Sequence, residues 1–186
     1  MIIRALAFST LLALPLAARA QQADIAPETV LSAVTGDWNN DGSMDRAVLV
    51  EDEDGADLLV YLSDGDNGMK LAASAKAFVW SGAIWGTLPE LRLSTSGGLQ
   101  VHAENDGVGR NRWDQVYSLA YRDGKMVVAG LTATSHDTLD PKAGGSCDIN
   151  FLTGKGTANR KAVTVAGGAT AVSDWTDDSV PQACQF

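Results

Sequence analysis

The sequence predicts a mainly β protein built as a single antiparallel domain, and two observations lead to this fold class. Glycine and aspartate recur roughly every eight to a dozen residues, as they do where short strands alternate with tight turns. No long stretch shows the 3.6-residue spacing of apolar side chains that is typical of an amphipathic helix. We therefore expect about eight to ten strands in a sandwich, a barrel or an open curved sheet, and not a full propeller.

The clearest strand pair surrounds Asp123-Gly124, a two-residue turn of the type that needs a positive φ at both positions. This turn fixes the register of the hairpin, so that Tyr121 is expected opposite Met126, and Leu119 opposite Val128. The segment "AVLVEDEDGADLLVYL" predicts a second strand pair around Asp54-Gly55. Its arms are apolar on both faces, as in a covered central position.

A third hairpin is predicted about Gly97-Gly98 in "ELRLSTSGGLQVHAEN". His102 alternates there with the apolar Val101. We expect this histidine to point to water from a polar face of the strand.

The first twenty residues are interpreted as a signal peptide. Arg4 precedes the apolar run "ALAFSTLLALPLA", and "ARA" at residues 18–20 has the small-x-small form of a cleavage site. A short membrane anchor is the alternative, but the apolar run is too short to span a bilayer. We expect residues 21–29 to be a flexible lead-in and residues 30–186 to form one β domain of a periplasmic or secreted protein.

The charge of the chain argues against two classes of partner. Removal of residues 1–20 takes away two basic residues and no acidic one, which lowers the formal net charge from −9 to −11. So acidic a chain is repelled by phosphate backbones and anionic lipid. We expect no nucleic-acid partner and no membrane insertion after signal cleavage.

The two cysteines, Cys147 and Cys184, both lie in the exported part. A lone cysteine pair in an oxidising compartment most simply forms one disulfide. A reactive thiol is the alternative, but "GGSCDIN" offers no neighbouring histidine or basic residue to lower a thiol pKa. We expect the bridge to tie the C-terminal tail to a strand.

The segment "GDWNNDGSMD" at residues 36–45 has the spacing of a calcium loop. Oxygen donors stand at alternate positions, with a glycine where the chain must turn: Asp37, Asn39, Asp41, the backbone carbonyl of Ser43, and Asp45. Hard oxygen donors favour Ca²⁺ over Zn²⁺. The position where an EF-hand needs a bidentate glutamate is Val48, so the loop opens a strand. A metal-free, Asx-rich turn is the alternative.

"GDWNNDGSMDRAVLV" resembles the calcium-binding signature of FG-GAP and VCBS-type repeats, in which such a loop precedes a strand. The resemblance implies that the five residues of the loop bind calcium. Those repeats usually occur in series as propeller blades, whereas this chain has one copy. The segments "GRNRW", "YRDG", "VVAG" and "CDINFLTGKG" are similar to small exported bacterial proteins with a single such loop at the start of a β domain.

These observations favour an exported β protein that acts as a binding or interaction module, with calcium in a structural role and an unidentified protein or glycan as partner. A metal-dependent exported hydrolase is a second hypothesis, and an inhibitor of a cell-wall or host enzyme is a third. The sequence favours a binding protein over an enzyme. A catalytic metal keeps an open position beside a general base, whereas this loop fills its positions with closely spaced oxygens of its own. No catalytic residue is predicted.

Overall fold

The computed structural model describes residues 25–53, 55–65, 68–140 and 142–186, and this part of the chain contains eleven strands. The mainly β prediction is confirmed, with one strand more than the upper expectation. The strands are β1 (Val30–Gly36), β2 (Asp45–Asp52), β3 (Gly55–Ser63), β4 (Met69–Val79), β5 (Glu90–Leu93), β6 (Leu99–Asn105), β7 (Asn111–Arg122), β8 (Lys125–Asp137), β9 (Gly144–Asn150), β10 (Lys155–Ala158) and β11 (Lys161–Thr164).

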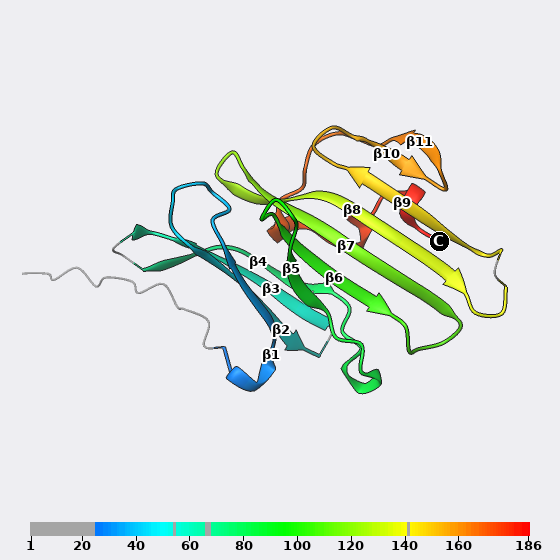
Figure 1. Ribbon diagram of the computed structural model, residues 1–186, viewed down its shortest axis with the longest axis horizontal. Helices are drawn as coiled ribbons and strands as arrows, with labels where there is room; N and C mark the ends of the chain where they lie inside the picture. Colours follow the sequence, from blue (N-terminus) through cyan, green and yellow to red (C-terminus); the bar gives the residue numbers. More distant parts are fainter. Residues whose placement is uncertain (1–24, 54, 66–67, 141) are drawn as a thin grey trace, which may run out of the picture.

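The strands form two antiparallel sheets in which each strand pairs with its neighbour in sequence (Figure 1). Four strands in the order β1-β2-β3-β4 make the smaller sheet, and seven in the order β11-β10-β9-β8-β7-β6-β5 make the larger one. The helical segments that the structure describes in full are 3-10 turns of three residues: η1 (Pro27–Thr29), η3 (Ala83–Trp85), η4 (Val172–Asp174), η5 (Asp177–Ser179) and η6 (Gln182–Cys184). Short hairpin connections give this topology because each turn returns the chain beside the strand that it has just left.

The two sheets enclose one hydrophobic core. Their first strands adjoin, where the Leu91 amide of β5 donates to Ser32 Oγ of β1 at 3.0 Å. Fully buried side chains come from both sheets and include Leu49, Leu58, Val101 and Leu131. Of the arrangements that the sequence left open, the structure is therefore a two-sheet packing.

The predicted hairpin about Asp123-Gly124 is confirmed. Both turn residues have positive φ, 49° and 79°, and the ladder places Tyr121 opposite Met126 and Leu119 opposite Val128. A register shift then lies between Ser118 and Leu119. The C-terminal segment reaches this point, since the Val128 amide donates to the Thr170 carbonyl at 2.9 Å.

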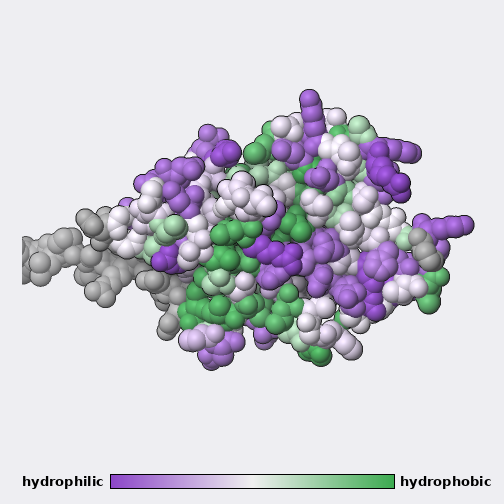
Figure 2. Space-filling model, in the orientation of Figure 1, coloured by the Kyte–Doolittle hydropathy of each residue, from purple (hydrophilic) through white to green (hydrophobic). Residues whose placement is uncertain are grey.

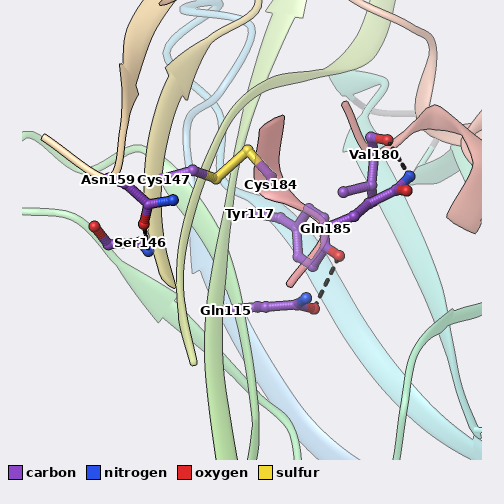
Figure 3. The surroundings of a disulfide bond; sticks show 8 residues. All are labelled: Gln115, Tyr117, Ser146, Cys147, Asn159, Val180, Cys184 and Gln185. Atoms are coloured by element: carbon purple, nitrogen blue, oxygen red, sulfur yellow. Dashed lines mark hydrogen bonds between the residues drawn. A yellow bond between two sulfur atoms is a disulfide. The ribbon is translucent and has the colours of Figure 1, made fainter. Parts of the chain in front are cut away.

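The C-terminal segment closes one end of the core. Trp175 packs edge-on against Tyr117 of β7, with ring centroids 5.9 Å apart, and lies 5.5 Å from Phe151. The predicted disulfide joins Cys147 of β9 to Cys184 of η6. Figure 3 shows the tail around Cys184 and Gln185 beside the Tyr117 ring of β7, with the disulfide reaching Cys147 on β9, the strand beyond β8. The tail is therefore covalently attached to the larger sheet.

The predicted signal peptide, residues 1–20, and residues 21–24 of the predicted lead-in lie outside the described residues. Residues 27–29 of that lead-in form η1, which contacts β2. Within the described ranges, no helix has the length and apolar character needed to cross a membrane.

Candidate functional site

The predicted calcium loop connects β1 to β2. The ladder between these strands ends at the pair Gly36 and Asp45, so the loop is the whole connection between them. Asn40 and Gly42 adopt positive φ values of 59° and 86°. Asparagine and glycine are the residues that tolerate this left-handed conformation best, and together they turn the chain back within a few residues.

Three side chains of the loop form a compact polar network. The two carboxylate oxygens of Asp37 accept the amides of Asp41 and Gly42, at 3.1 and 3.0 Å. Asn39 Oδ1 accepts the same Asp41 amide at 3.0 Å, and Asn39 Nδ2 donates to Asp41 Oδ2 at 2.7 Å. Asp41 Oδ1 accepts the Ser43 amide at 2.7 Å. The network satisfies the backbone of an exposed turn and concentrates oxygen atoms on it.

These donors also keep Asp41 charged. The Asn39 amide group and then the Ser43 backbone amide hydrogen-bond the carboxylate and lower its pKa below the ordinary value. A carboxylate that is ionised and exposed remains able to bind a cation from solvent.

Asp45 has a different environment from the other loop carboxylates, because it is fully buried. Its Oδ2 accepts the Trp38 amide at 2.8 Å, and its Oδ1 accepts the Ser63 amide at 3.0 Å, from the end of β3. Asp45 therefore anchors the loop to the smaller sheet. Each oxygen retains a lone pair, so the anchor does not prevent metal ligation.

Trp38 folds back over the start of the loop and is buried there. Its ring lies on Gly36, where an added Cβ would meet Trp38 Nε1 at 2.6 Å. A side chain at position 36 would therefore displace the indole. Glycine at this position allows the loop to close over its own anchor.

The loop residues fit an oxygen-coordinated cation in type, but the structure does not bring their three carboxylates to one point. Among the described residues, the His, Cys, Asp and Glu side chains whose ligand atoms lie within 4.8 Å of one another are His102, Glu104 and Asp114. This group could hold a metal ion. Calcium ligation by Asp37, Asn39, Asp41, Ser43 and Asp45 stays a prediction.

This second group was not predicted from the sequence, and the predicted solvent exposure of His102 was wrong although its face of the strand was right. His102 was expected to point to water, yet it is only 5% exposed, because β5 and β7 flank it and their carboxylates cover the ring. The spacing of His102 and Glu104 puts both on one face of β6 and was visible in the sequence. The approach of Asp114 to these two residues was not visible in the sequence, because it depends on the register between β6 and β7.

A third candidate lies where β2 ends and the chain leaves β4. A hollow of about 330 Å³ is lined by an acidic stretch, Glu51, Asp52 and Glu53, and by the aromatic and apolar side chains Trp80, Ile84 and Trp85. Ile84 is 92% exposed and Trp85 is 62% exposed. Ser81 also lines the hollow, and its hydroxyl is buried without a hydrogen-bond partner among the described residues.

One cation stands at the border of this acidic stretch. Lys76 Nζ donates to Asp52 Oδ2 at 3.1 Å and also to Asp57 Oδ2. The two carboxylates raise the pKa of Lys76. The Glu53 backbone amide, followed by Lys76, lowers the pKa of Asp52. Lys76 thus offsets part of the charge of Asp52, whereas Glu51 and Glu53 form no ion pair with any described residue.

Comparison of the chain with protein-family models, with curated proteins and with solved structures finds no match.

Proposed function

We propose that the protein is an exported interaction module that binds a basic protein partner through the hollow lined by Glu51, Glu53, Trp80, Ile84 and Trp85. The observation that supports this function best is the exposure of two large apolar side chains, Ile84 and Trp85, on one short projecting turn. Figure 1 places η3 beyond the ends of the strands, and Figure 2 shows apolar residues at this projection and around the meeting of β1, β2 and β5.

Adjacent exposed apolar side chains that form one patch with polar residues at its rim are typical of protein interaction sites. Tryptophan is also the residue that most often dominates the energy of a protein interface, because its large ring is buried at little cost in conformational entropy. The Trp80 ring is held in place by edge-on packing against Trp113, with centroids 5.6 Å apart. One wall of the hollow is thus rigid before any partner binds.

The charge around the hollow indicates the chemistry of the partner. Glu51, Asp52 and Glu53 line the same space as the two indole rings. A lysine or arginine side chain can contact the carboxylates and the indole rings together. Its charge pairs with the carboxylates, while the guanidinium face of arginine or the aliphatic stem of lysine packs against the rings. A basic protein surface is therefore favoured over an uncharged glycan.

Calcium has a structural role in this proposal. The loop between β1 and β2 carries the oxygen donors, and its buried anchor Asp45 reaches the end of β3. An ion bound at this loop would hold the ends of three strands of the smaller sheet in one arrangement. Export is supported by the disulfide between Cys147 and Cys184, a bond that persists in oxidising compartments.

The binding surface is tested by photo-crosslinking from a single position in cells that export the protein. A photoreactive residue replaces Ile84 in one variant. In the control variant it replaces Leu139, which is also apolar and highly exposed but lies after β8. We expect position 84 to capture a basic protein that position 139 does not capture.

The captured protein is then purified and titrated against wild-type and Trp85→Ala protein. We expect the substitution to cost about 2 kcal/mol, roughly a 30-fold loss of affinity, as for a central interface tryptophan. Binding should also weaken at high salt, because the partner is basic. The proposal is wrong if both positions capture the same proteins, or if Trp85→Ala binds as tightly as wild type.

A further inference from the structure

The larger sheet carries a buried histidine on its outer face. Val101 and Ala103 of β6 lie in the core, so the alternating residues His102 and Glu104 lie on the opposite face. His102 Nε2 is 2.6 Å from Asp114 Oδ2, and its Nδ1 is 3.7 Å from Glu90 Oε1. One imidazole is therefore placed between two carboxylates, with a third close by.

The strand register explains why these groups meet. Glu104 of β6 is directly opposite Asp114 of β7, and His102 is directly opposite Glu90 of β5. Like charges at directly opposed positions destabilise a sheet. Glu104 and Asp114 form such a pair, so a cation between them would turn a repulsion into a favourable contact.

We propose that His102, Glu104 and Asp114 bind a zinc ion, with Glu90 orienting the imidazole from behind. Zinc binds imidazole nitrogen and carboxylate oxygen at about 2.0–2.2 Å in a tetrahedron, which puts ligand atoms roughly 3.4 Å apart. The ligand atoms here all lie within 4.8 Å of one another, and the His102–Asp114 distance is 2.6 Å. Side-chain shifts of about 1 Å create the site.

The surroundings of the imidazole supply the parts that a metal-bound histidine uses. Such a histidine commonly directs its second nitrogen at a carboxylate, which fixes the ring and raises its basicity. Glu90 Oε1 faces Nδ1 from 3.7 Å, beyond hydrogen-bond distance, and Arg92 holds the same oxygen; a shift of under about 1 Å would bring it into the orienting position. The Asp114 side chain is 48% exposed, so an ion can enter from solvent and keep a water as its fourth ligand.

This site is chemically and spatially distinct from the calcium loop. The loop offers oxygen donors alone and connects two strands of the smaller sheet. The second site lies on β6 and β7 of the larger sheet and includes an imidazole. Imidazole is a common zinc ligand, whereas calcium prefers oxygen ligands. The two sites should therefore bind their ions independently.

The proposal is tested with the mature protein, stripped of metal and titrated with zinc by calorimetry. We expect one saturable site per chain. His102→Ala should abolish binding at this site. Asp114→Asn should weaken it at least tenfold, and Glu90→Gln should weaken it 10- to 100-fold, as for carboxylates that orient a ligand. Cobalt in place of zinc should give visible absorption that requires His102.

Two control variants separate this site from others. His136→Ala removes the other histidine of the chain, which is exposed on β8, and should leave zinc affinity unchanged. Asp41→Ala alters the calcium loop and should also leave zinc affinity unchanged. Circular dichroism shows whether each variant is folded. If His102→Ala does not fold, Asp114→Asn provides the test, because asparagine keeps the shape of the aspartate side chain. The proposal is overturned if wild type does not bind zinc, or if wild type and Asp114→Asn bind zinc with equal affinity.

Discussion

At the scale of single residues, Asp45 is the side chain on which the loop between β1 and β2 depends most. Its two oxygens satisfy the amides of Trp38 and Ser63, and none of its surface reaches solvent. In Asp45→Ala both amides lose their acceptor inside the protein. We expect the free energy of unfolding to fall by about 2–4 kcal/mol, measured by urea denaturation without calcium.

The matched control is Asp41→Ala, which removes a carboxylate from an exposed position of the same loop. Its loss should cost less than about 1 kcal/mol in the absence of calcium. Equal destabilisation by the two substitutions would show that burial and the anchor bonds of Asp45 are not the cause.

Tyr117 provides a second residue-scale prediction, in alkaline solution. Burial, followed by the negative charge of Asp177, raises the pKa of Tyr117 to about 12 from the ordinary value of 10.0. The unfolded chain therefore loses this proton first, near pH 10. Stability from the neutral phenol is complete below pH 10 and is lost as the pH rises through 12, by about 2–3 kcal/mol.

Urea denaturation of wild type and Tyr117→Phe between pH 9 and pH 12 measures this effect. This pH range includes the interval between the pKa of the unfolded chain and that of the folded protein. The phenylalanine variant keeps the packing against Phe78 and Trp175 but has no proton to lose. Its stability should fall less steeply with pH. Identical slopes for the two proteins would contradict the prediction.

At the scale of elements, the loop between β1 and β2 should transmit calcium binding to the smaller sheet. An ion that binds the folded state alone stabilises it by RT ln(1 + [Ca²⁺]/Kd), about 1.4 kcal/mol at ten times Kd. Calorimetric melting with and without chelator should then differ by a few degrees. The expected affinity is that of weak extracellular sites, about 10⁻⁴–10⁻³ M.

Asp37→Ala removes the carboxylate that accepts two amides of the loop. We expect it to abolish the effect of chelator on the melting midpoint while the β spectrum remains. Magnesium should substitute poorly, because it requires strict octahedral geometry and retains its waters. A midpoint that does not respond to calcium would remove the structural role proposed for the ion.

At the scale of the whole molecule, the disulfide joins the C-terminal tail to the larger sheet over a separation of 37 residues. The chain-entropy model gives about 4 kcal/mol for a loop of this length. We expect Cys184→Ser to lower the free energy of unfolding by a few kcal/mol and to expose Trp175, whose fluorescence should shift to the red. Thiol labelling of unreduced, denatured wild type should find no free cysteine.

The expected exposure of Trp175 distinguishes local detachment of the C-terminal tail from a general loss of stability. Trp175 contacts Tyr117 and Phe151, so detachment of the tail should open this seam before the sheets separate. Hydrogen exchange should therefore rise first in residues 170–186 of the variant. Uniform acceleration of exchange across both sheets would contradict a local closing role for the tail.

The sequence by itself determined the features that depend on local chemistry. The Asp123-Gly124 turn fixed its hairpin register because two-residue turns with positive φ allow one pairing. The disulfide followed from a lone pair of cysteines. The loop at residues 36–45 was visible because its donors alternate within ten residues, although its metal remains a prediction.

Only the tertiary structure decided which distant residues meet. Glu90, His102 and Asp114 belong to three strands, and they converge because two strand registers align them on one face. The acidic stretch of β2 and the indoles after β4 share a hollow for the same kind of reason. The burial of Asp45 and His102 was equally hidden, because alternation along a strand gives the face of a side chain but not the groups that cover it.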